Sequence, residues 1–197
     1  MAQATRAKHV RGGRLHKALM KAALESVFDV GFRATSIESI ATKTGMAKTT
    51  IYRRWPNKAA LVMDAFMARL SSGTSGTPFL PAEKVTDSIK HQMRLMAKAF
   101  RGKDGALIKS LLAEAQFDPE LAMAFRERWT LPRRKIASEV LHEAIRRGEL
   151  LPGIDIETTI DLLYAPMYYR LQMGIGPLSE AYIDGLFHHA MQGLACC

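Results

Sequence analysis

The chain has 197 residues, of which 48% are hydrophobic, so it can bury a substantial core in one large domain or in two smaller ones. No apolar run reaches the roughly 18 residues that span a bilayer, and the basic start lacks the apolar block of a secretory signal. We therefore expect a cytoplasmic protein with no membrane partner. Cys196 and Cys197 are adjacent in the sequence, which excludes a disulfide framework across the fold.

The net charge of +9 is concentrated at the start of the chain. The first 60 residues hold 12 Lys and Arg against 3 Asp and Glu, whereas the rest of the chain holds 16 against 16. Clustered positive charge can neutralise phosphates and release their counterions, while a spread excess serves mainly solubility. Charge alone leaves three explanations open: nucleic-acid binding, a solvated basic tail and a membrane-surface segment.

The first 34 residues predict an arm followed by a helix. Residues 1–13 are small, polar and basic and contain Gly12 and Gly13, which predicts a mobile arm. Apolar residues then recur at helical spacing from Leu15 to Val30, and Gly31 provides a C-terminal stop. The first helix is therefore expected to begin at about residue 14.

Three shorter helices are predicted next. Thr35 is suited to cap a helix of about two turns that ends at Gly45, and residues 48–55 form the next helix. Pro56 interrupts the pattern, and Asn57 should cap a fourth helix that runs from residue 58 towards residue 71.

The remainder of the chain also has helical periodicity. Residues 71–81 are uncharged and rich in Ser, Gly, Thr and Pro, which predicts a linker. Helices are expected near residues 85–100, 106–115, 118–147 with a bend at Pro132, 155–173 and 179–194. No alternating β-type segment was found, so the predicted fold class is all-α, with an N-terminal domain over residues 1–60 and a helical C-terminal domain over 61–197.

Residues 36–55 have the spacing of a helix-turn-helix, with two short helices joined by a turn that contains Gly45. Ile51 and Trp55, four residues apart, should hold the second helix to the first. The outer side would carry side chains whose types suit base edges, namely Lys48, Thr49, Thr50 and Arg53. Three further side chains are suited to phosphates, namely Tyr52, Arg54 and Lys58.

Residues 23–61 resemble the DNA-binding signature of the TetR (tetracycline repressor) family. The matching positions are Ala23, Phe28, Gly31, Thr35, Ile37, Ile40, Ala41, Gly45, Tyr52, Trp55 and Lys58. The resemblance implies a three-helix DNA-binding domain with a helical domain that binds an effector and dimerises. It also implies base contacts by Lys48, Thr49 and Arg53 and phosphate contacts by Thr35, Thr50, Tyr52 and Lys58. The alternatives are a core role for Tyr52 and a plain solvated side chain for Lys48.

Residues 146–171 resemble the penultimate region of many members of this family. Apolar side chains surround the predicted 155–173 helix on nearly every side, so one face should meet the core and another a second subunit. The last helix has a broad apolar stripe from Ile183 to Leu194 that suits a four-helix interface between two copies, although burial within a monomer is the alternative. A homodimer would present two recognition helices about 34 Å apart to palindromic double-stranded operator DNA.

Large apolar residues of the C-terminal region could line one effector cavity, although each is also compatible with an ordinary core. They are Met93, Met96, Phe100, Phe125, Trp129, Tyr164, Met167 and Tyr168. Methionine adapts to varied ligand shapes, and Tyr164 or Tyr168 would offer a hydroxyl. This composition predicts a small apolar or aromatic effector.

The sequence thus favours a transcription regulator, most simply a repressor that a small effector releases from its operator. The alternative is a DNA-binding protein of the same fold that responds to a partner protein. We expect that the protein is not an enzyme and has no cofactor, because no phosphate-binding glycine loop, nucleophile elbow or H-E-x-x-H zinc pattern was found. His188 and His189 would point about 100° apart on a helix, so no metal site is expected either.

Overall fold

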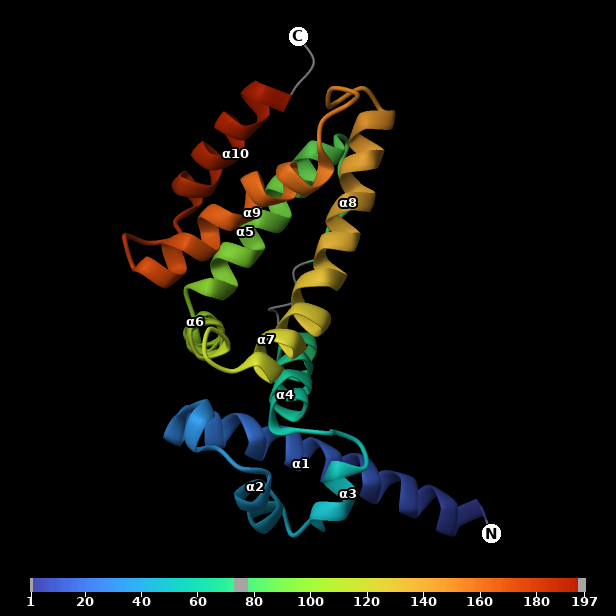
Figure 1. Cartoon of the computed structure of the whole chain (residues 1–197). Helices are drawn as coiled ribbons and strands as arrows, with labels where there is room; N and C mark the ends of the chain where they lie inside the picture. The colour runs from blue at the N-terminus through green and yellow to red at the C-terminus, as the bar shows by residue number, and fades with distance from the viewer. Residues whose placement is uncertain (1, 73–77, 195–197) are drawn as a thin grey trace. The chain divides into compact units, whose positions relative to one another are not determined.

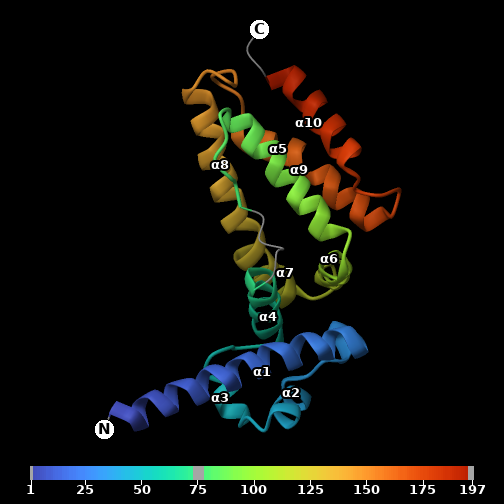
Figure 2. The same cartoon turned by 180° about the vertical axis from the view of Figure 1, so that it is seen from behind.

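The computed structural model describes residues 2–72 and 78–194, which form helices and no strand (Figures 1 and 2). This confirms the all-α prediction. The elements are α1 (Ala2–Ala34), α2 (Ile37–Thr44), α3 (Lys48–Tyr52), α4 (Lys58–Ser72), α5 (Val85–Phe100), α6 (Lys103–Ala115), α7 (Pro119–Phe125), the π turn η1 (Arg126–Thr130), α8 (Leu131–Arg146), α9 (Ile156–Met173) and α10 (Glu180–Leu194). Across the described residues, no helix is both long and apolar enough to cross a membrane.

The chain divides into two compact units. Unit 1 consists of Met1–Ser71 and Ser110–Arg128, and unit 2 consists of Ser72–Lys109 and Trp129–Cys197. The contacts therefore group the helix-turn-helix with α4, the end of α6 and α7. The boundary that the sequence predicts between a DNA-binding domain and a C-terminal domain, at residues 60 and 61, stays a prediction.

In unit 1, α1 begins at Ala2, so the mobile arm predicted for residues 1–13 is wrong over residues 2–13. Residue 1 lies outside the described residues. Ala, Gln, Arg and Lys around the glycine pair favour a helix, and each interior glycine costs only about 1 kcal/mol relative to alanine. The predicted stop at Gly31 is present, because its φ of 79° and ψ of 164° kink the helix there.

The core of unit 1 holds the three N-terminal helices and α4 together. α2 packs on α1, and α3 packs on α2. The fully buried or nearly fully buried side chains include Leu19, Ala23, Val27, Phe32, Ile40, Ile51, Trp55, Leu61 and Phe66. Asn57 caps α4 as predicted, since its side-chain oxygen accepts a hydrogen bond from the backbone N–H of Ala60 at 2.8 Å.

The predicted linker over residues 71–81 is only partly described. α4 continues to Ser72, residues 73–77 lie outside the described residues, and residues 78–82 have no helix.

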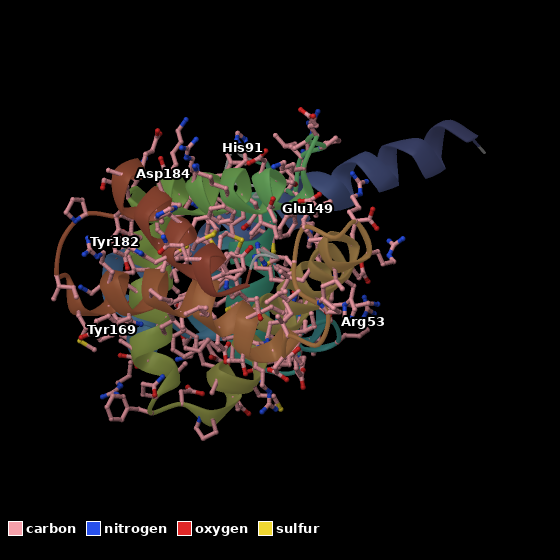
Figure 3. All side chains as sticks on the ribbon, turned by 90° about the horizontal axis from the view of Figure 1, so that it is seen from above. Arg53, His91, Glu149, Tyr169, Tyr182 and Asp184 are labelled. Carbon is pink, nitrogen blue, oxygen red and sulfur yellow. The ribbon has the colours of Figure 1, made fainter. Side chains whose placement is uncertain are left out.

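In unit 2, α5 contacts α8, α9 and α10, and α9 also contacts α8 and α10. Glu149 fastens the start of α5, because its carboxylate accepts hydrogen bonds from the backbone N–H groups of Val85 and Thr86, each at 2.9 Å. Arg94 of α5 donates two hydrogen bonds to Asp184 of α10, at 2.8 and 2.6 Å. Figure 3 shows Asp184 where α10 runs beside α5.

The helix predicted over residues 118–147 is present from residue 119 to residue 146, and it contains a π turn close to the predicted bend. Asp118 caps α7, and the π turn η1 separates α7 from α8. Pro132 is in the first turn of α8, where its missing N–H is tolerated. A π turn of this kind often marks a functional position in a helix.

The dimer interface expected at the apolar stripe of α10 stays a prediction. Ile183, Phe187 and Ala190 are buried within the protomer, where α10 packs on α5, whereas Leu186 and Met191 are half-buried. Exposed apolar side chains also lie on α9, where Leu162, Tyr169 and Met173 are 46%, 58% and 61% exposed. Their spacing places them on one face of the helix, and Figure 3 labels Tyr169 on α9.

Candidate functional site

The turn between α2 and α3 has the geometry of a helix-turn-helix. Ser36, rather than the predicted Thr35, is the N-cap of α2, and its hydroxyl oxygen accepts a hydrogen bond from the backbone N–H of Ser39 at 3.1 Å. Gly45 ends α2 in the left-handed region with a φ of 66°, and its N–H bonds back to the last turn. The chain can therefore reverse within three residues before α3 begins.

α3 separates its buried and exposed faces as the sequence predicted. Ile51 is fully buried and Trp55 is 2% exposed, so these two residues hold the helix on the core. Six predicted contact residues are all exposed, namely Lys48, Thr49, Thr50, Tyr52, Arg53 and Arg54. α3 ends at Tyr52 and Arg53 follows as its C-cap, so the helix is shorter than the predicted 48–55. Arg53 is labelled in Figure 3.

Glu38 on α2 lies among these exposed side chains. Its carboxylate is 3.7 Å from the Lys48 ammonium and accepts a hydrogen bond from the Tyr52 hydroxyl at 3.4 Å. Glu38 was not among the residues predicted to belong to the site. Its position in the first turn of α2, beside the positive end of the helix dipole, is the local reason for an acidic residue there.

Trp55, which follows α3, contacts side chains of α1 and α4. Its ring stacks on His16 with centroids 5.8 Å apart, and the Arg54 guanidinium lies 5.1 Å from its ring centre. The indole N–H donates to Asp64 at 2.7 Å, and Asp64 also pairs with Arg128. Desolvation lowers the pKa of His16, and the nearby Arg54 lowers it further.

A surface hollow of about 360 Å³ opens beside the start of α2. It is lined by Thr35, Ser36, Ile37, Glu38, Tyr52, Pro56, Asn57 and Lys58. The ammonium of Lys58 donates to the carbonyl oxygens of Phe32 at 2.8 Å and Arg33 at 3.2 Å, which leaves one of its three donors. Burial lowers the pKa of Lys58, while the carboxylates of Asp118 and Glu114 act in the opposite direction.

The structure does not support the predicted phosphate contact by the Thr35 hydroxyl. Thr35 is only 3% exposed, and its hydroxyl donates to the carbonyl of Gly31 at 2.8 Å and lies 3.2 Å from the Ser26 hydroxyl. These bonds close the end of α1 around the kink. Ser36, one residue later, also lines the hollow and is half-buried rather than buried.

Most of the predicted effector residues lie in unit 2. Met93, Met96, Phe100, Trp129 and Met167 are buried, and Tyr164 and Tyr168 are half-buried. The Trp129 indole N–H donates to the Tyr168 hydroxyl at 2.8 Å, and the rings of Phe100 and Tyr168 meet edge to face at 5.2 Å. Phe125 is also buried but belongs to unit 1.

Two polar residues of this core were missed at the sequence level. Arg133 lies with its guanidinium 3.4 Å from the ring centre of Trp129, and Gln92 accepts a hydrogen bond from the Tyr164 hydroxyl at 2.8 Å. The spacing of Trp129 and Arg133, four residues apart on one helical face, was a usable signal. Gln92 and Tyr164 are far apart in the sequence, and no local pattern connects them.

No group of three or more His, Cys, Asp and Glu side chains is arranged to hold a metal ion in the part of the chain that the structure describes. The rings of His188 and His189 are tilted by 56° with centroids 5.5 Å apart.

Comparison with known proteins identifies two matching family models. Residues 19–65 match the model described as bacterial regulatory proteins of the tetR family, and residues 83–190 match the tetracyclin repressor-like C-terminal domain. Each compact unit thus contains residues that match one of these family models.

Individual relatives span nearly the whole chain. An uncharacterised helix-turn-helix transcriptional regulator of Bacillus subtilis, YdeS, is 36% identical over 180 residues, which is 91% of this chain and 89% of the relative. The DNA-binding transcriptional repressor TetR of Mycobacteroides abscessus is 29% identical over 179 residues, or 89% of this chain and 91% of that protein. The crystal structure of the TetR family regulator SCO0332 superposes with a TM-score of 0.74 at 27% identity and covers 92% of this chain and 97% of that one.

These comparisons confirm the resemblance found in residues 23–61 and the expectation of a regulator rather than an enzyme. Regulators of this kind bind operator DNA and form dimers. The helix-turn-helix in unit 1 and the two family models together place the chain: it belongs to the TetR family of DNA-binding transcription regulators.

Proposed function

We propose that the protein is a repressor that binds a palindromic operator as a homodimer and leaves it when a small effector occupies unit 2. The observation that carries the DNA-binding half is the exposure of six polar or basic side chains on α3 and the two residues after it, while Ile51 and Trp55 anchor the segment. Lys and Arg suit guanine edges, and threonine methyl groups suit thymine. The basic excess of the first 60 residues adds a sequence-independent attraction to phosphates.

The hollow at the start of α2 supports a phosphate contact next to α3. Ser36, Tyr52 and Lys58 line it, and the positive end of the α2 dipole favours an anion there. Phosphate contacts of this kind fix the register of a recognition helix, whereas base contacts determine the sequence that it prefers.

The exposed stripe on α9 supports the homodimer. Leu162, Tyr169 and Met173 share one face and are each about half exposed or more. Pairing two copies would remove these side chains from water, and a two-fold axis would place the same surface on both subunits.

The test of operator binding is footprinting on the DNA upstream of the protein's own gene. The proposal predicts protection of two half-sites that are related by a two-fold axis and whose centres are about one helical turn apart or a multiple of it. Protection of a single asymmetric site, or equal coverage of any sequence, would contradict it.

Release by a small molecule is the second half of the proposal. A ligand that prefers the folded protein raises Tm by mass action, and it weakens DNA binding only if it prefers the conformation that does not fit the operator. A screen by thermal shift followed by operator titration therefore tests it. Compounds that raise Tm and weaken operator binding support an effector; regulation by a partner protein is favoured if only a protein fraction changes operator affinity.

A protein that is similar in structure alone indicates which kind of ligand the fold can bind. FadR from Bacillus subtilis, crystallised in complex with stearoyl-CoA, has a TM-score of 0.68 at 17% identity. The same fold there accommodates a ligand with a long apolar part, which is consistent with the apolar composition of the core of unit 2.

A further inference from the structure

Two neighbouring arginines at the start of α8 have opposite surroundings. Arg134 is neutralised by two carboxylates of α9, those of Glu157 and Asp161. Arg133 makes no ion pair with any described residue. Its guanidinium lies on the Trp129 ring, and its one hydrogen bond to the described part of the chain is a long one of 3.5 Å from Nη1 to the Trp129 carbonyl.

A half-buried cation without a carboxylate is costly for the folded protein. Removing a charge from water costs free energy that an ion pair normally offsets, and a cation–π contact offsets it only partly. Consistent with this, desolvation lowers the pKa of Arg133, although the neighbouring Tyr168 acts in the opposite direction. Because a guanidinium stays protonated at neutral pH, Arg133 keeps a positive charge and unused N–H donors.

Two tyrosines of α9 and one glutamine of α5 add further polar groups to this part of unit 2. The Tyr168 hydroxyl accepts from the same indole that Arg133 covers, so its own proton is available to a ligand. Tyr164 lies one turn earlier on α9, and its hydroxyl donates to Gln92, a side chain only 5% exposed. The Gln92 amide nitrogen makes no hydrogen bond to another described residue, so it too can donate to a ligand. Methionines and Phe100 form the apolar part of this core.

We propose that the effector of unit 2 is a small organic monocarboxylate with an apolar or aromatic body, whose carboxylate binds the Arg133 guanidinium and the Tyr168 hydroxyl. The proposal rests on the proposed function, because it names the chemical class of the molecule that releases the repressor. A carboxylate matches the planar fork of a guanidinium in two parallel hydrogen bonds. The hydroxyl of Tyr168 and the amide of Gln92 would fix the orientation of the ligand, and Met93, Phe100 and Met167 would contact its body.

The charges favour a monocarboxylate over a phosphate ester. Arg133 is the one cation that the described contacts place on this cluster, since Arg134 is already paired with carboxylates. A single unpaired positive charge balances a single negative charge, whereas a phosphate dianion would remain half unbalanced in a desolvated site.

Pairs of acids and their amides test the proposal directly, because each pair differs in charge and hardly in shape. The probes are benzoate with benzamide, phenylacetate with phenylacetamide, and octanoate with octanamide, each at up to about 10 mM to allow for weak binding. Tm is measured on the full-length protein. Binding is measured by Trp129 fluorescence in Trp55→Phe, which leaves Trp129 as the sole tryptophan of the chain.

Three variants separate charge from packing. Arg133→Met keeps an unbranched apolar stem but removes the charge, Arg133→Lys keeps the charge but loses the fork, and Arg134→Met removes the neighbouring arginine as a matched control. At least one acid should bind roughly tenfold or more tightly than its amide, the size expected for a charge-assisted hydrogen bond. Arg133→Met should abolish this preference, Arg133→Lys should keep part of it, and Arg134→Met should leave it unchanged.

The outcomes distinguish this proposal from the proposed function. Equal binding of acids and amides, or an acid preference that survives in Arg133→Met, would overturn the carboxylate assignment while leaving release by a neutral effector intact. If no acid shifts either Tm or Trp129 fluorescence, the carboxylate site is also overturned. Operator release by an unrelated compound would then still support the proposed function, and failure of every compound to affect operator binding would contradict it.

Discussion

Glu38 places a carboxylate among the cations of the recognition face. It lies 3.7 Å from the Lys48 ammonium and accepts the Tyr52 hydroxyl, so it orders two residues that we expect to contact DNA. The same charge repels phosphates. DNA binding must therefore compete with the contacts of Glu38.

Replacing Glu38 by Gln should strengthen binding to DNA. The substitution removes a negative charge near the phosphates and frees Lys48, so we expect roughly threefold to tenfold tighter binding at low salt, a gain that shrinks as salt increases. Fluorescence anisotropy with a labelled duplex measures it. Glu25→Gln is the matched control, because Glu25 is also exposed and paired with a lysine, Lys21, but lies on α1. Weaker binding by Glu38→Gln would show that ordering of Lys48 matters more than repulsion.

Thr35 illustrates how a residue type can suit two roles. Its polar side chain in the family signature predicted a phosphate contact, but the kink at Gly31 brings its hydroxyl to the Gly31 carbonyl and to Ser26. Gly31 predicted a stop of the helix, but the sequence pattern does not specify which groups the Thr35 hydroxyl meets beyond it.

We expect Thr35→Val to destabilise the protein by about 1–2 kcal/mol, because it leaves buried polar groups without their hydrogen-bond partner. Thr35→Ser should keep most of the stability. Urea unfolding gives both values, and DNA affinity of the folded variants should be unchanged. A loss of DNA affinity in Thr35→Val without a loss of stability would restore the phosphate contact.

At the scale of the elements, local signals predicted the helices well. Asn57 and Asp118 are N-caps with the hydrogen bonds expected of their side chains, and Gly45 ends α2 in the left-handed region. Contacts between elements were less predictable. Glu149 caps α5 from 64 residues further along the chain, and periodicity carries no information about such a pair.

The Glu149 cap makes a prediction about pH. Desolvation would raise the pKa of Glu149, but the hydrogen bonds from Thr86 and Val85 outweigh it, so the folded-state pKa is below its ordinary value of 4.5. The charged cap therefore stabilises the fold above about pH 4.5, and this stabilisation is lost as the pH falls through the folded-state pKa.

Glu149→Gln should thus lower Tm by about 2–4 °C at pH 7, which corresponds to roughly 1 kcal/mol for a chain of this size. The difference from the wild type should shrink as the pH falls below 4.5 and through the folded-state pKa of Glu149. Glu139→Gln, at an exposed position of α8, is the control and should change little at either pH. A Tm difference for Glu149→Gln that is constant with pH would contradict the charged cap.

At the scale of the whole molecule, the sequence indicated the family, the helical class and the outward face of α3. It did not divide the apolar stripe of α10 between the protomer core and a dimer surface, because an apolar stripe looks alike whether it covers α5 or a second subunit. Ile183 and Phe187 of α10 are buried within the protomer, whereas Leu162 and Tyr169 of α9 are exposed.

The exposed face of α9 predicts the effect of a charge placed there. Tyr169→Glu should convert the dimer into a monomer, because a carboxylate would lie in an apolar interface. Light scattering after size exclusion measures the mass, and Ile136→Glu, a change at an apolar residue of α8 that is 50% exposed, is the matched control. A Tyr169→Glu protein that remains dimeric at micromolar concentration would exclude this face from the interface.

The most direct test of the central claim, that α3 reads an operator, is a salt series of DNA binding with the wild type, Lys48→Ala and Tyr52→Phe. The DNA is the protein's own upstream region beside a scrambled duplex, and Lys135→Ala, an exposed lysine on α8, is the control. We predict tight, steeply salt-dependent binding that prefers the upstream region, is weakened by both α3 substitutions and is unaffected by Lys135→Ala. Equal binding to both duplexes, unchanged by Lys48→Ala and Tyr52→Phe, would contradict the account.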